Sequence, residues 1–191
     1  MKSNIEALLP QQKIKESSFR NLYVVDYKNL NNGNVELLEK EPIDIKSVHL
    51  QNSNNVNVYF VGFEDNILGA GNQQCECVLF PQTCEEKDWV LFVECKYAKD
   101  KVTAKDKDRD YARKMIDQII ATVNYFRING VLSNKKKVHA IVSFPNLLQN
   151  FSAFVFSAVY PLTMEDFLEQ HNIIIRATNS AVIKSAKMIK I

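Results

Sequence analysis

The stretch that decides the fold is Asp88-Trp89-Val90-Leu91-Phe92-Val93-Glu94-Cys95-Lys96, an apolar run that ends in a carboxylate and an ammonium group. The run predicts a buried strand. Residues two apart in a strand share a face, so Glu94 and Lys96 point the same way. Charged groups at the end of a buried strand are costly unless partners such as a metal ion and a phosphate hold them. Glu94-Cys95-Lys96 is therefore a candidate active site.

Strand alternation divides this segment into two faces. One face carries Asp88, Val90, Phe92, Glu94 and Lys96, and the other carries Trp89, Leu91, Val93, Cys95 and Tyr97. Asp88 shares the face of Glu94, but six residues at about 3.3 Å each place the two about 20 Å apart. Asp88 is therefore too distant to share a metal ion with Glu94. A second E-x-K string, Glu85-Glu86-Lys87, falls in a predicted turn, so the string alone decides nothing.

A second carboxylate is expected across a hairpin. The apolar segment 75–80 and the strand 88–96 are separated by a polar turn, which predicts that they pair. If the numbers of paired residues sum to 170, apolar residues face apolar ones and Glu76 faces Glu94. Two carboxylates with β-carbons about 5 Å apart repel each other unless they are protonated or bridged by a cation. A divalent metal ion is the simplest bridge.

The chemistry of such a site follows from its donors. Carboxylate oxygens, a backbone carbonyl and water suit Mg²⁺ or Mn²⁺. Beside a phosphodiester, either ion polarises the phosphoryl group and lowers the pKa of an attacking water. Lys96 would add positive charge where the phosphorane becomes more anionic, or would position the water. The alternative is an ordinary ion pair between Glu94 and Lys96 at a strand end, with Glu76 exposed near the other rim.

The rest of the chain predicts alternating strands and helices. The expected elements are a short helix at 4–9, a strand at 22–27, a β-hairpin within 48–63, a helix at about 105–128, a buried strand at 138–144, a helix at about 164–170 with Thr163 as N-cap, and a strand at 172–177. The long helix between two buried strands predicts a strand-helix-strand crossover. Gln118 and Tyr125 lie beside its apolar face, where we expect them to pack at the boundary of the core.

Length and composition favour one domain. A chain of 191 residues that is 46% hydrophobic can bury a sizeable core. We expect an N-terminal extension at 1–42, a core at 43–145 and a C-terminal part at 146–191 that completes the sheet. The sequence contains no apolar run of about 18 residues and no apolar signal region near its start, so we expect a soluble, cytoplasmic protein without membrane contact.

The cysteine content and the net charge exclude few classes of function by themselves. The four cysteines are Cys75, Cys77, Cys84 and Cys95, and their spacing differs from zinc knuckles, so we expect reduced cysteines that pack in the core. The net charge of +2 provides no broad cationic surface. It neither supports nor excludes a nucleic-acid partner.

The order of hairpin, carboxylate strand, E-x-K strand, long amphipathic helix and buried strand resembles the core of the PD-(D/E)xK nuclease superfamily. The similarity spans about Val48 to Phe144, with motif residues in Cys75–Phe80 and Phe92–Lys96. The resemblance implies a restriction-endonuclease-like α/β fold, in which helices flank a mixed central sheet. It also implies an Mg²⁺-dependent nuclease that acts mostly on DNA.

The resemblance assigns a role to each motif residue. It implies that Glu76 takes the place of the first Asp, that Glu94 is the second acidic metal ligand and that Lys96 is the catalytic lysine. It also implies that the Cys95 carbonyl is a further metal ligand. Glu76 is a departure from the pattern, because a glutamate reaches one methylene further than an aspartate.

A second departure is that no clear helix with a glutamate precedes the first strand, which leaves Glu6 and Glu64 as candidates. Two functions therefore stay open. One is a metal-dependent nuclease, for which a homodimer would suit cleavage of both strands. The other is a non-catalytic module that binds protein or nucleic acid and keeps the fold, with an apolar surface at 151–160 for a protein partner.

Overall fold

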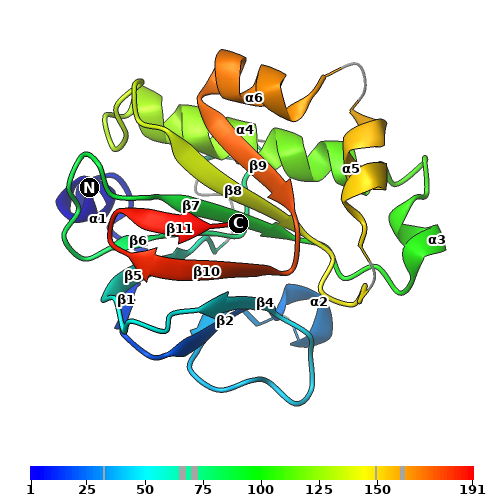
Figure 1. The fold of residues 1–191 in the computed structure, drawn as a ribbon, viewed down its shortest axis with the longest axis horizontal. Helices are drawn as coiled ribbons and strands as arrows, with labels where there is room; N and C mark the ends of the chain where they lie inside the picture. Colours follow the sequence, from blue (N-terminus) through cyan, green and yellow to red (C-terminus); the bar gives the residue numbers. More distant parts are fainter. Residues whose placement is uncertain (32, 65–67, 70–72, 149, 160–161) are drawn as a thin grey trace.

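Two β-sheets and a layer of helices make up the structure, a computed structural model (Figure 1). It describes residues 1–31, 33–64, 68–69, 73–148, 150–159 and 162–191. Both sheets contain parallel and antiparallel neighbours. The protein is therefore mixed α/β, which confirms the predicted class.

The first sheet has six strands in the order β1-β5-β6-β7-β8-β9. Their bounds are β1 Ile14–Ser17, β5 Val58–Gly62, β6 Cys77–Pro81, β7 Leu91–Cys95, β8 Val138–Ser143 and β9 Ile173–Ala177. Neighbours from β1 to β7 are antiparallel, whereas β7, β8 and β9 are parallel. Parallel neighbours need a crossover, and the helix α4 (Tyr111–Ile128) supplies it between β7 and β8, as predicted.

The second sheet has five strands in the order β11-β10-β4-β2-β3. Their bounds are β2 Asn21–Asp26, β3 Val35–Leu38, β4 Val48–Gln51, β10 Ser180–Ser185 and β11 Met188–Lys190. The strands β4 and β5 thus lie in different sheets, so the predicted hairpin within 48–63 is wrong. The buried amide of Asn52 bonds the N–H and the carbonyl of Val56 and closes a loop between the two strands.

Residues 1–42 are integral to both sheets. They supply β1 to the first sheet and β2 and β3 to the second. The C-terminal part is divided in the same way, because β9 completes the first sheet while β10 and β11 extend the second.

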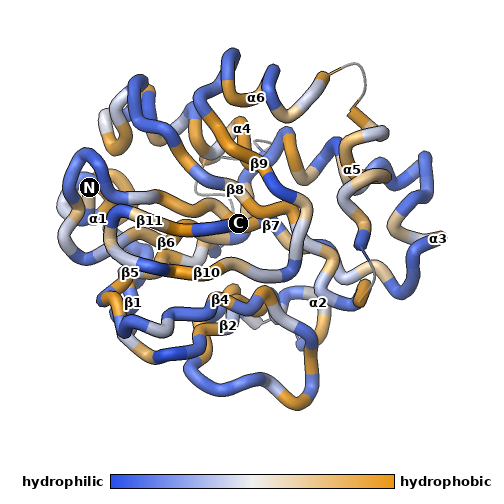
Figure 2. The backbone as a smooth tube through the Cα atoms, viewed as in Figure 1, coloured by the Kyte–Doolittle hydropathy of each residue, from blue (hydrophilic) through white to orange (hydrophobic). Residues whose placement is uncertain are grey.

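The strand β7 is covered on both faces. Val90 and Phe92 pack in a core with α4, while Leu91 and Val93 pack in a second core between the sheets. This arrangement confirms the predicted alternation and explains why the run is continuously apolar. Figure 2 shows hydrophobic residues along the central strands and hydrophilic ones mainly in the outer loops.

Two predicted boundaries differ from the structure by more than two residues, and side-chain hydrogen bonds explain the first. The strand β7 begins at Leu91 rather than Asp88, because the Asp88 carboxylate accepts hydrogen bonds from the Thr83 hydroxyl (2.5 Å) and the Glu85 N–H (2.8 Å) in the turn. The helix α4 begins at Tyr111 rather than near residue 105. Asp110 before it has a left-handed backbone (φ 45°) that interrupts the helix.

The remaining helices are α1 Lys2–Leu8, α2 Lys28–Asn31, α3 Lys101–Ala104, α5 Ser152–Ala158 and α6 Met164–His171. Thr163 caps α6 in a reciprocal capping box with Asp166, which confirms the predicted N-cap. Within the described ranges, no helix has the length and apolar character needed to cross a bilayer.

Candidate active site

The register of the β6–β7 hairpin is the predicted one. Cys77 pairs with Val93 and Val78 with Phe92, so the paired numbers sum to 170. Glu76 directly precedes β6, and its N–H donates to the Val93 carbonyl (3.0 Å). Glu76 therefore lies across the hairpin end from Glu94.

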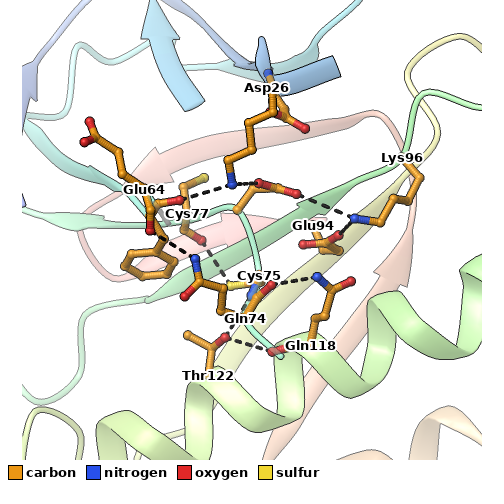
Figure 3. A network of polar contacts seen from close by, with 12 residues as sticks. Asp26, Glu64, Gln74, Cys75, Cys77, Glu94, Lys96, Gln118 and Thr122 are labelled. Carbon is orange, nitrogen blue, oxygen red and sulfur yellow. Dashed lines mark hydrogen bonds and ion pairs between the residues drawn. The ribbon is translucent and has the colours of Figure 1, made fainter. Parts of the chain in front are cut away.

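One ammonium group joins the two carboxylates (Figure 3). Lys96 Nζ lies 2.6 Å from Glu94 Oε1 and 3.7 Å from Glu76 Oε1. Glu94 is fully buried and Glu76 is only 5% exposed, whereas the Lys96 side chain is 24% exposed. The structure thus brings together the three residues that the sequence singled out, at an edge that solvent reaches through Lys96.

A second lysine, which the sequence did not indicate, completes the cluster. Lys28 Nζ lies 2.9 Å from Glu76 Oε2 and 3.2 Å from the Phe63 carbonyl oxygen. The Lys28 N–H donates to Asp26 Oδ1 (2.9 Å) at the end of β2. Asp26 and Lys28 repeat the spacing of Glu94 and Lys96 at the end of the predicted strand 22–27, but no local pattern predicts that this strand ends near Glu76.

Burial and charge act together on the titration of the cluster. Burial raises the pKa of Glu94 well above its usual range, and the Glu76 charge raises it further, while Lys96 and Lys28 oppose both effects. Burial also raises the pKa of Asp26, again with help from Glu76. Burial alone would lower the pKa of each lysine, but the carboxylates outweigh it and the pKa of both is raised.

Within the described ranges, Glu94 has one charged partner, Lys96, and its second oxygen is left without one. Neither oxygen accepts a hydrogen bond of good geometry from the described residues, and only Oε1 has the close ion contact with Lys96. With Asp26 and Glu76, the cluster holds three carboxylates against two ammonium groups. A buried carboxylate oxygen without a partner is costly, by about 1–3 kcal/mol or more for a charged group. A further cation at Glu94 would remove this cost.

The donor set fits a hard divalent cation. Glu76 and Glu94 supply carboxylate oxygens, which Mg²⁺ and Mn²⁺ prefer. The part of the chain that the structure describes contains no group of three or more His, Cys, Asp or Glu residues that could hold a metal. The remaining ligands would therefore be carbonyl, water or phosphate oxygens, as is usual for Mg²⁺.

Three of the four cysteines pack in the core, as expected, whereas Cys84 is partly buried against it. Cys75, Cys77 and Cys95 are buried and free, and burial raises the pKa of their thiols. The Cys95 side chain lies in the core between the two sheets, on the face opposite Glu94. Only its carbonyl is thus left as a metal ligand, and that role stays a prediction.

The helix α4 supports the chain just before Glu76. Gln118 Nε2 donates to the Gln74 carbonyl (2.7 Å), and the Cys75 N–H donates to Thr122 Oγ1 (2.9 Å). We expected Gln118 to pack at the core boundary, and its contact additionally helps to position Glu76. Tyr125 is partly buried and packs against the core, as expected.

Neither candidate for an additional glutamate reaches the cluster. The Glu64 carboxylate accepts a hydrogen bond from Asn34 and points away from Glu94 (Figure 3). Glu6 pairs with Lys2 on α1, and Asn4 of that helix donates to the Gly130 carbonyl beyond the far end of α4.

The site therefore consists of a buried carboxylate pair with two lysines, and its interpretation rests on this geometry. No protein-family model, no curated protein and no solved structure matches the chain.

Proposed function

We propose that the chain is a divalent-metal-dependent nuclease that hydrolyses phosphodiester bonds, with DNA as its substrate. The observation that carries the proposal is the fully buried Glu94, which meets Glu76 at the shared Lys96 ammonium and has an oxygen without a partner among the described residues. A site that needs a cation and presents a lysine toward solvent suits a phosphodiester.

The arrangement of elements supports the same proposal. The strands β5, β6 and β7 form an antiparallel meander, and α4 then leads to β8, which is parallel to β7. A carboxylate at the start of β6 and an E-x-K segment at the end of β7 resemble the restriction-endonuclease-like core. We include that fold in the proposal.

Each residue has a distinct task in this proposal. Glu76 and Glu94 hold Mg²⁺ or Mn²⁺, with the Cys95 carbonyl as a further ligand. When bound, the ion supplies Lewis acidity that polarises the phosphoryl group and lowers the pKa of an attacking water. Lys96 places its ammonium where negative charge develops on the phosphate. Gln118 and Thr122 hold the backbone that carries Glu76.

A second candidate is a binding module that keeps the fold without the chemistry. One observation favours it, because both Glu76 oxygens already face lysines. The apolar surface expected at 151–160 is partly buried in the core, which leaves less of it for a protein partner. Phe151 and Val155 are buried, and Phe144 contacts the rings of Phe151 and Phe154. Tyr160, at the end of that surface, lies outside the described residues.

The test combines Mn²⁺ titration calorimetry with nicking of supercoiled plasmid. We expect Glu94→Gln to abolish Mn²⁺ binding, and Lys96→Ala to reduce nicking by at least about 100-fold while Mn²⁺ still binds. Glu85→Gln and Lys87→Ala, in the second E-x-K string, are matched controls that keep both properties. Unchanged nicking in Glu94→Gln and Lys96→Ala would rule out the nuclease.

Sedimentation of the wild type on DNA tests the homodimer expected for cleavage of both strands.

A further inference from the structure

Lys28 contacts the carboxylate that a metal ion would need. We propose that Lys28 is a displaceable counter-ion, which neutralises Glu76 in the metal-free protein and competes with the divalent cation for that carboxylate. The inference rests on the proposed metal-dependent function and concerns the regulation of the same site.

The four carboxylate oxygens of Glu76 and Glu94 differ in their contacts with the two lysines. Glu76 Oε2 lies 2.9 Å from Lys28 Nζ, and Glu76 Oε1 lies 3.7 Å from Lys96 Nζ. Glu94 Oε1 contacts Lys96, while Glu94 Oε2 has no partner among the described residues. A cation thus finds an open oxygen on Glu94 but meets an ammonium at Glu76.

A metal ion and the Lys28 ammonium cannot both keep Glu76 Oε2 at close range. Oxygen ligands lie about 2.1 Å from Mg²⁺, so an ammonium on the same oxygen would face the ion a few ångströms away. Two cations repel strongly at that distance in a partly buried site. Metal binding through Glu76 Oε2 therefore requires Lys28 to leave.

Lys28 is better placed to move than Lys96. Its side chain is 32% exposed, and its other hydrogen bond within the described residues goes to the neutral carbonyl of Phe63, at 3.2 Å. Lys96 is held 2.6 Å from the buried Glu94. The backbone of Lys28 stays fixed by its hydrogen bond to Asp26. The flexible four-carbon stem can then swing out and return when the metal leaves.

The experiment measures Mn²⁺ affinity by titration calorimetry, with circular dichroism melting to show that each variant is folded. Lys28→Met removes the competitor, so we expect Mn²⁺ to bind at least tenfold more tightly than to the wild type. Lys28→Arg replaces the ammonium by a guanidinium that can grip a carboxylate with two hydrogen bonds, so we expect weaker binding than wild type.

Lys46→Met is the matched control for charge alone. Lys46 borders the same region, because its backbone carbonyl accepts a hydrogen bond from the Tyr97 hydroxyl. Its ammonium forms no ion pair with a carboxylate of the described residues. We expect its affinity to stay within about twofold of the wild type, since exposed charges are largely screened.

The outcomes separate the inference from the function beneath it. Equal or weaker Mn²⁺ binding by Lys28→Met than by the wild type overturns the competition. An equal gain in Lys46→Met overturns it too, because net charge then explains the effect. Absence of Mn²⁺ binding by the wild type and every variant instead overturns the proposed metal-dependent function.

Discussion

The two E-x-K strings of this chain share the same pair of charged residues but lie in different surroundings. Glu85-Glu86-Lys87 lies in the β6–β7 turn, where the half-exposed Glu85 pairs with Lys187 across 3.2 Å. Glu94-Cys95-Lys96 ends β7, where Glu94 has no exposed surface. Water screens the exposed pair of Glu85 and Lys187. The buried Glu94 is shielded from water, so only protein groups such as Lys96 can compensate its charge. Burial, not the string of residues, makes a carboxylate require a cation.

Removal of the lysine should distinguish the two pairs most strongly. We expect Lys96→Met to lower the free energy of unfolding by about 3 kcal/mol, because it leaves a buried carboxylate uncompensated. Lys187→Met should change it by less than about 1 kcal/mol, since exposed ion pairs contribute little. Urea unfolding at neutral pH measures both. Equal losses would show that burial does not set the value of the pair.

Removal of a supporting hydroxyl should have a smaller effect. Thr122→Val leaves the buried Cys75 N–H without its acceptor, so we expect a loss of about 2 kcal/mol in unfolding free energy. Thr83→Val removes one of two hydrogen bonds to Asp88 Oδ2, which keeps the Glu85 N–H as a donor, and should cost about 1 kcal/mol or less. Urea unfolding compares them, and a larger loss for Thr83→Val contradicts the expected order.

The pH dependence of stability should isolate Glu94. Its pKa is raised in the folded state above the ordinary 4.5, so the native protein binds more protons than the unfolded chain between the two pKa values. Stability from this group is thus full below about pH 4.5 and is lost as pH rises through the folded pKa. The loss has a limiting slope of about 1.4 kcal/mol per pH unit.

The check is urea unfolding of wild type, Glu94→Gln and Glu85→Gln between pH 5 and pH 8. Glu94→Gln should remove most of the decline, whereas Glu85→Gln should keep the wild-type slope. Asp26, whose pKa is also raised, contributes the decline that remains. A full decline in Glu94→Gln would place the titration elsewhere.

Local patterns predicted the parts of the fold in which the partners are close in sequence. The hairpin register was predictable because the strands on either side of one turn have matching apolar faces. The Thr163 cap of α6 was predictable because its partner Asp166 is three residues away. The predicted hairpin within 48–63 failed because β4 pairs instead with β2 and with β10, whose residue Ser180 lies beside His49.

The sequence by itself determined the buried strand β7, its two faces and the meeting of Glu76 with Glu94, because period-two alternation and one short turn carry that information. Only the tertiary structure decided that Lys28 and Asp26 join them. Their position depends on the packing of one sheet on the other, through a core that residues far apart in the chain build together. Long-range packing leaves no local pattern, so the second lysine of the site was visible only in the folded protein.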